Sequence, residues 1–141
     1  MAAHDMGREP SVALLHLLWE VANTNRNQIQ LVLARHHLTE AMAGVLWMLD
    51  ASAGPVPMRD IAPTVGCDPS NVSLMSDRLE DLGLVERQRH PDDGRARVLA
   101  LTAKGRTVWS KALSQMTATS ALGSLTATEQ TRLQLLLSKL R

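Results

Sequence analysis

The sequence contains no phenylalanine and no tyrosine, and tryptophan occurs only three times. We therefore expect Trp19, Trp47 and Trp109 to act first of all as bulky packing residues. There is one cysteine, Cys67, so no disulfide can form within the chain. A cysteine-poor chain is typical of a reducing compartment, and we expect a cytoplasmic protein.

Long apolar runs and a strong charge of one sign are also missing. Glu20, Asn23 and Asp50 interrupt the apolar stretches well before they reach membrane-spanning length, which predicts that no segment crosses a membrane. The N-terminal MAAHDMGREP has no basic segment leading into an apolar run, so no signal peptide is predicted. The net charge is +1, so contact with nucleic acid would depend on where individual charges lie.

Sequence patterns of catalysis and metal binding are absent as well. The chain has no glycine-rich phosphate loop, no nucleophile elbow and no pair of carboxylates expected to share a cleft. No Cys/His spacing matches a metal-ligand set. The sequence therefore predicts a protein that is not an enzyme, with no catalytic residue, no metal site and no cofactor.

What the sequence does contain is a series of helical patterns. Apolar residues at helical spacing predict helices over 11–36 and 40–51, the second capped by Thr39. A breaker cluster predicts a loop over 51–57, followed by a short helix over 58–66 that contains Pro63. Asp68 and Pro69 then predict the start of another helix, which ends at Gly83.

The second half begins with alternating residues. LVERQRH and ARVLALT flank the turn PDDGR, residues 91–95, and this pattern predicts a β-hairpin. Thr102 is expected to cap a helix over 103–119, and Thr126 with Glu129 has the spacing of a capping box for a last helix. The predicted fold class is mainly α with a small β-hairpin wing, a winged helix-turn-helix. We expect a DNA-binding lobe over 39–101 and a helical dimerisation region formed by 1–38 and 102–141.

Two segments of the sequence resemble the MarR family of bacterial transcription regulators. DGRARVLALT, residues 93–102, matches the family's D-x-R-x-x-x-x-x-L-T signature at each fixed position. SLMSDRLEDLGLVER, residues 73–87, is similar to the family's recognition helix and its exit into the wing. With helices expected in the same order on both sides, the resemblance covers essentially the whole chain.

The resemblance implies a homodimer that binds double-stranded DNA as a transcription regulator, most simply a repressor released from its operator by a small ligand. Two recognition helices would enter successive major grooves of a pseudo-palindromic operator, about 34–36 Å apart. Arg95 would insert into the minor groove at the tip of the wing, with Asp93 orienting its guanidinium.

Further contact residues follow from the positions on these two elements. Short hydrogen-bonding side chains begin the recognition helix, and basic side chains flank the wing as expected phosphate contacts. The predicted DNA-binding residues are Ser70, Asn71, Ser73, Leu74, Arg87, Arg89, Asp93, Arg95 and Arg97. Leu74 departs from the basic residue frequent in the family and could contact only a thymine methyl group, while Arg78 is expected to form a local ion pair with Asp77.

Three alternatives accompany this interpretation. A winged-helix module can bind proteins instead of DNA, and a regulator of this fold can sense metal. Cys67 precedes a helix N-terminus, which lowers a thiol pKa and would suit a redox sensor, although Cys67 can equally act as a small buried apolar side chain.

A small aromatic or amphipathic effector is expected in a pocket lined by His16, Trp19 and Trp47.

Overall fold

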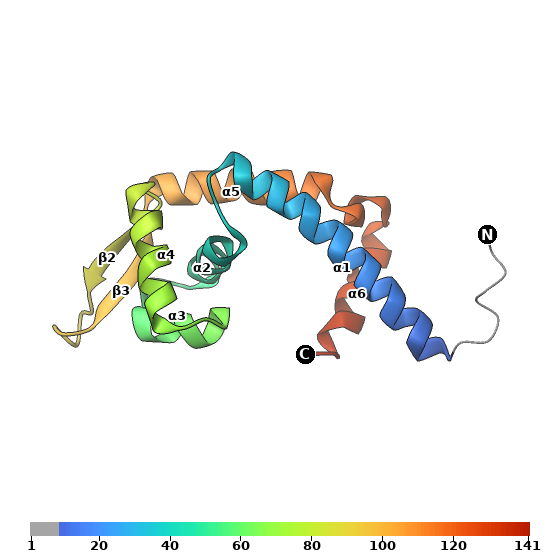
Figure 1. Cartoon of the computed structure of the whole chain (residues 1–141), viewed down its shortest axis with the longest axis horizontal. Helices are drawn as coiled ribbons and strands as arrows, with labels where there is room; N and C mark the ends of the chain where they lie inside the picture. Colours follow the sequence, from blue (N-terminus) through green and yellow to red (C-terminus); the bar gives the residue numbers. More distant parts are fainter. Residues whose placement is uncertain (1–8) are drawn as a thin grey trace. The chain divides into compact units, whose positions relative to one another are not determined.

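The computed structural model describes residues 9–141, and the N-terminal residues 1–8, on which the signal-peptide prediction depends, lie outside the described part. The described chain is mainly helical, with a small antiparallel sheet, which confirms the predicted fold class (Figure 1). In chain order its elements are α1 (Pro10–Arg35), α2 (Glu40–Ala51), β1 (Val56–Pro57), α3 (Met58–Val65), α4 (Pro69–Asp81), β2 (Val85–Arg89), β3 (Arg97–Leu101), α5 (Ala103–Thr119), a 3-10 turn (Ala121–Ser124) and α6 (Ala127–Ser138).

The chain divides into two compact units, which are described separately. The sheet unit is Val32–Gln115 and contains α2, α3, α4 and all three strands. Among the described residues, the helical unit combines 9–31 with Met116–Arg141, and so holds most of α1 together with α6. Among the described residues, no helix is both long and apolar enough to cross a membrane.

Local hydrogen bonds explain where several helices begin. The Thr39 hydroxyl accepts a hydrogen bond from the Met42 N–H at 3.2 Å, and Thr126 forms a full capping box with Glu129, as predicted. Thr102 also caps α5 as predicted, because its hydroxyl accepts the Gly105 N–H at 2.9 Å.

Asp68 stands at the predicted N-cap position of α4, but its side chain makes no capping hydrogen bond. Its backbone carbonyl accepts the N–H groups of Asn71 and Val72 instead, at 3.0 and 3.1 Å. The helix therefore starts at Asp68 as predicted, with these two donors bonded to the Asp68 backbone and not to its side chain.

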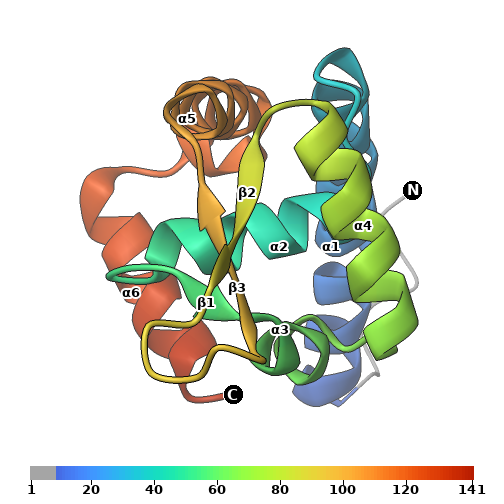
Figure 2. The ribbon, with the colours of Figure 1, turned by 90° about the vertical axis from the view of Figure 1, so that its left-hand side faces the viewer.

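The sheet has the strand order β1-β3-β2, and β3 pairs antiparallel with both neighbours (Figure 2). The expected hairpin is confirmed: Val85 pairs with Leu101 at one end and Arg89 with Arg97 at the other. The prediction that 51–57 is entirely loop is wrong, because Val56 and Pro57 form β1 opposite Leu99 and Val98. So short a strand has no alternating pattern of its own, and it exists only because it pairs with a distant segment.

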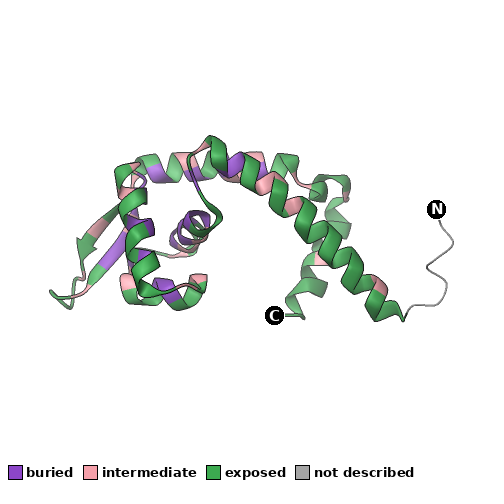
Figure 3. Ribbon diagram, in the orientation of Figure 1, coloured by how far each residue is buried: buried purple, intermediate pink, exposed green. Residues whose placement is uncertain are grey.

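The core of the sheet unit lies between its helices and the sheet. Leu46 of α2, Ile61 of α3, Leu79 of α4, Leu99 of β3 and Trp109 of α5 are all almost completely buried. Figure 3 shows these buried segments concentrated on the inner sides of α2, α4 and the strands. The core therefore fixes α3, α4 and the hairpin relative to one another.

Glycine is needed at two positions around the joint between α4, β2 and α5. Gly83 has φ +73° just after α4, a conformation that favours glycine, so the chain can turn directly into β2. Gly105 lies in the first turn of α5 against the backbone carbonyl of Leu84, where a Cβ atom would clash. The start of α5 is thereby held against the segment that joins α4 to β2.

Candidate nucleic-acid interface

Helix α4 presents a polar face to solvent. Its buried side is formed by Val72, Met75, Ser76 and Leu79, and this leaves the remaining positions outside the core. The exposed positions include four predicted contact residues, Ser70, Asn71, Ser73 and Leu74. Leu74 is 50 % exposed on this helix, which gives an apolar side chain among hydrogen-bonding ones.

Arg78 belongs to the same exposed face, and the sequence-based expectation for it was wrong. Asp77 forms its ion pair with Arg87, at 2.7 Å, instead of with Arg78. Within the described part of the chain, the Arg78 side chain has no ion pair or hydrogen bond. Its spacing of four residues from Leu74 and seven from Asn71 places it on their side of the helix. This spacing is visible in the sequence and could have identified it.

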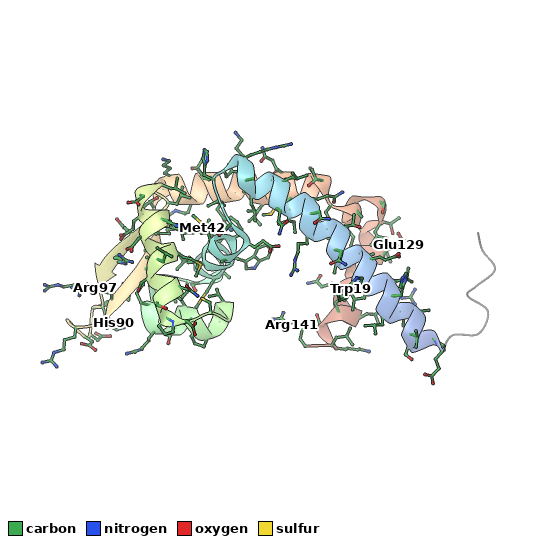
Figure 4. All side chains as sticks on the ribbon, viewed as in Figure 1. Trp19, Met42, His90, Arg97, Glu129 and Arg141 are labelled. Atoms are coloured by element: carbon green, nitrogen blue, oxygen red, sulfur yellow. The ribbon has the colours of Figure 1, made fainter. Side chains whose placement is uncertain are left out.

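The β2–β3 hairpin carries the second group of candidate residues on its loop, residues 90–96. The loop is closed by a hydrogen bond from the His90 N–H to the Ala96 carbonyl, at 3.1 Å, and by one from the Ala96 N–H to the Asp93 carbonyl, at 3.1 Å. The His90 ring accepts the Asp92 N–H at 3.1 Å. Figure 4 shows His90 and Arg97 on this hairpin, at the end away from the helices of the sheet unit. The loop is therefore ordered by its own groups while its outer side chains stay exposed.

Asp93 acts on the loop backbone. Its carboxylate accepts a hydrogen bond from the Arg95 N–H at 3.0 Å, and no ion pair to the Arg95 guanidinium occurs among the described residues. Among the described residues, Asp93 therefore binds the backbone of Arg95 and not its guanidinium, which was the expected contact. An aspartate bonds readily to the N–H two residues further on, so Asp93 shapes the turn and leaves the exposed Arg95 side chain projecting from it.

Arg89 and Arg97 face each other across the hairpin. They are directly paired residues of β2 and β3, and both are exposed. Like charges in this position destabilise a strand pair. The only hydrogen bond of these two side chains among the described residues is a long one, 3.5 Å, from Arg97 to the Gly94 carbonyl. Neither arginine forms an ion pair within residues 9–141, so both charges remain exposed at this end of the hairpin.

Arg87 differs from the other arginines of the hairpin. Its guanidinium lies 2.7 Å from Asp77 and 3.3 Å from Glu80, and it donates to the Ser73 carbonyl at 3.0 Å. Only 28 % of its side chain is exposed. These internal partners argue against the predicted phosphate contact, because the charge is already compensated by two carboxylates.

The three residues of the expected effector pocket fall in different units. His16 and Trp19 belong to the helical unit, where His16 lies 3.7 Å from Glu20 and Trp19 is 69 % exposed. Trp47 belongs to the sheet unit and is 61 % exposed. Of the three tryptophans expected to act as bulky packing residues, Trp109 is buried in the core, and it meets Trp47 edge to face with ring centroids 5.9 Å apart.

Trp47 lines an open, mostly apolar groove of about 500 Å³ in the sheet unit. The other lining residues come from α2, the end of α3 and the segments that follow them: Glu40, Ala41, Gly44, Met48, Ala51, Ser52, Thr64, Val65 and Cys67. Cys67 is half-buried there and is the one cysteine of the chain. No group of three or more potential metal ligands occurs in residues 9–141.

Comparison with known proteins agrees with this geometry. The model of the MarR family matches residues 38–96, which include α2, β1, α3, α4, β2 and the loop after it, and end just before β3. The HTH-type transcriptional repressor Rv2887 of Mycobacterium tuberculosis is 30 % identical over 137 residues, which cover 96 % of this chain and 98 % of that protein.

Solved structures show the same fold. A MarR family regulator from Rhodococcus sp. RHA1 has a TM-score of 0.76 at 25 % identity, over 95 % of this chain and 96 % of that one. Sco5413, a MarR family regulator from Streptomyces coelicolor, has a TM-score of 0.74 at 27 % identity, over 95 % and 94 %. The winged helix of the sheet unit, the two sequence segments and these relatives lead to one conclusion: this chain belongs to the MarR family of transcriptional regulators, which is not a class of enzymes.

Proposed function

We propose that this protein is a homodimeric repressor that binds a pseudo-palindromic DNA operator through α4 and the β2–β3 hairpin. The observation that carries the proposal is a group of three exposed arginines at the end of the hairpin, where Arg89 and Arg97 oppose each other next to Arg95 and none of them has an ion pair among the described residues. Two arginines that face each other repel in the free chain, but both are attracted by the negative charge of a DNA phosphate backbone.

Helix α4 supplies the proposed base contacts. Asn71 can pair with an adenine edge, Ser70 and Ser73 can serve bases or phosphates, and Leu74 can contact a thymine methyl group. Arg78 joins them because it is exposed on the same face. Arg95 would enter the minor groove, where a narrow groove concentrates negative potential.

The helical unit supports the dimer. Large apolar side chains of α1 and α6 are exposed in the single chain, among them Leu14, Leu18, Leu136 and Leu137. We propose that this unit, with the adjoining parts of 1–38 and 102–141, forms the dimerisation region and that 39–101 forms the DNA-binding lobe. Dimerisation would place two α4 helices on successive half-sites.

The proposal also covers the direction of regulation, the site of a small-molecule effector and the location of the protein. Repression is suggested by the name of the relative that is 30 % identical, a transcriptional repressor. The apolar groove beside Trp47 would accept a small aromatic or amphipathic effector, whose binding must then weaken DNA binding by the factor by which DNA weakens effector binding. Because the target is chromosomal DNA, we place the protein in the cytoplasm.

Arg95→Ala provides the direct test. Operator fragments are first selected from genomic DNA by the purified protein, and binding is then measured by fluorescence anisotropy at several salt concentrations. The substitution should weaken operator binding by about 1–3 kcal/mol, or roughly 5- to 150-fold, while the dimer persists in sedimentation.

Lys111→Ala is the matched control, since it removes one exposed positive charge from α5. It should change the affinity little. Equal affinities of the wild-type protein and Arg95→Ala would reject the wing contact. A wild-type protein that retains no fragment even at low salt would support a protein-binding module instead.

A further inference from the structure

Arg87 connects the two elements of the proposed DNA-binding surface. The residue belongs to β2, yet its guanidinium is bound to Asp77, Glu80 and the Ser73 carbonyl, which all belong to α4. The three contacts lie between 2.7 and 3.3 Å. A planar guanidinium holds several acceptors at fixed angles, so this set of bonds restricts how α4 can tilt relative to the strand.

Glu80 strengthens the same connection through the backbone. Strand β2 is at the edge of the sheet, and its Arg87 N–H donates to the Glu80 carboxylate at 2.9 Å. The other carboxylate oxygen of Glu80 accepts from the Arg87 guanidinium at 3.3 Å. One side chain of α4 therefore satisfies both a free edge-strand donor and part of a positive charge.

The acceptors on α4 follow one line along the helix, at Ser73, Asp77 and Glu80, with spacings of four and three residues. Ser73 is itself a proposed base or phosphate contact, so the arginine is bonded to the backbone of the helix at a point that would meet DNA. We propose that Arg87 is a positioning residue: it holds α4 and the hairpin in the relative placement that lets both contact one duplex, and it does not bind a phosphate itself. This inference rests on the proposed DNA-binding function.

Charge compensation favours this role over a phosphate contact. To bind a phosphate, Arg87 would have to leave Asp77 and Glu80, whose side chains are 57 % and 32 % exposed. Two carboxylates would then lie uncompensated on the surface that meets the negatively charged backbone. Arg89, two residues further along β2, has no such partner among the described residues and is fully available to DNA.

The test compares Arg87→Ala with Arg89→Ala, which removes the same side chain from the same strand. Operator affinity is measured over a range of salt concentrations with the full-length dimer. Removing a phosphate contact lowers the slope of log K against log salt by about 1. We expect this for Arg89→Ala. Arg87→Ala should weaken operator binding at least as much as Arg89→Ala does. The slope of log K against log salt should nevertheless stay at its wild-type value.

Arg87→Lys gives a second and independent result. Lysine keeps the charge but cannot reproduce the guanidinium contacts, so a positioning role predicts that it does not restore affinity, whereas a phosphate contact would be largely restored. Circular dichroism and sedimentation on each variant establish that it is folded and dimeric, and if Arg87→Ala does not fold, the lysine variant decides alone.

The outcomes separate the two proposals. If the wild-type protein binds an operator but Arg87→Ala lowers the salt slope as Arg89→Ala does, or lysine restores affinity, Arg87 contacts phosphate and the positioning role is wrong. If the wild-type protein binds no DNA at all, the proposed function fails first and this inference fails with it.

Discussion

The sheet unit and the helical unit differ in where their apolar side chains lie. Nearly all buried apolar residues of the described chain belong to the sheet unit, and Met116 is the one contributed by the helical unit. Most of the exposed large apolar residues of the described chain belong instead to the helical unit. The sheet unit contributes two of them, Trp47 and Leu74.

The difference shows which unit can be stable within one chain. The sheet unit buries aliphatic side chains from the end of α1, from α2 to α5 and from the sheet around one core, whereas α6 has no buried residue. Exposed leucines on α1 and α6 are unfavourable in water and become favourable only when another surface covers them. We therefore infer that the sheet unit folds around its own core and that the helical unit depends on a second chain.

The largest effect is expected from breaking the helical unit. Leu136→Glu puts a carboxylate into the proposed dimer interface, where an unpaired buried charge costs several kcal/mol. Sedimentation equilibrium should show a monomer at concentrations where the wild-type protein is a dimer, and operator binding should be lost with it. Gln134→Glu, which adds the same charge at an exposed position of α6, should leave the dimer intact. A dimeric Leu136→Glu would mean that the chains associate through another surface.

An intermediate effect is expected from the core of the sheet unit. Leu46 is completely buried and Leu74 is 50 % exposed, so replacing each by alanine removes the same atoms from opposite environments. Leu46→Ala should lower the free energy of unfolding by about 2–5 kcal/mol. Leu74→Ala should change it by less than about 0.5 kcal/mol. Urea unfolding followed by tryptophan fluorescence measures both, and equal losses would contradict the assignment of Leu74 to the functional surface.

The smallest effect concerns the start of α6. The Glu129 carboxylate accepts hydrogen bonds from the Thr126 backbone N–H and from the Thr126 hydroxyl. These bonds, the backbone one more than the hydroxyl one, lower the pKa of Glu129 below its usual value of 4.5. A lowered pKa in the folded state means that the capping box stabilises the helix above pH 4.5 and that this contribution is lost as the pH falls through the folded-state pKa.

An NMR titration of the Glu129 side chain should therefore give a midpoint below 4.5. In Thr126→Ala the midpoint should rise towards the usual value, because the hydroxyl donor is gone and the cap is weakened. A midpoint that does not differ between the two proteins would show that the capping box does not persist in solution.

Much of the fold could be predicted because its signals are local. Thr39, Thr102 and the pair Thr126 and Glu129 mark helix starts through bonds between residues close in sequence. The alternation on both sides of PDDGR predicts the hairpin for the same reason. The exposed contact residues of α4 were likewise predictable, because helical spacing separates the apolar positions from the polar ones.

Other features depend on residues that are far apart in the chain. β1 exists because Val56 meets Leu99, and nothing in the sequence around Val56 indicates that pairing. The partners of Arg87 lie on α4, and sequence alone does not distinguish it from Arg89 on the same strand. Trp47 is exposed and Trp109 buried, although composition alone suggested the same packing role for both.

By itself, then, the sequence determined the order of helices and strands, the turn that carries Arg95 and the family of the chain, since these depend on neighbouring residues and short motifs. Only the tertiary structure decided which arginines remain available to DNA and which one joins α4 to β2. The physical reason is that a charge acts according to the groups within a few ångströms of it, and folding brings those groups together from distant parts of the chain.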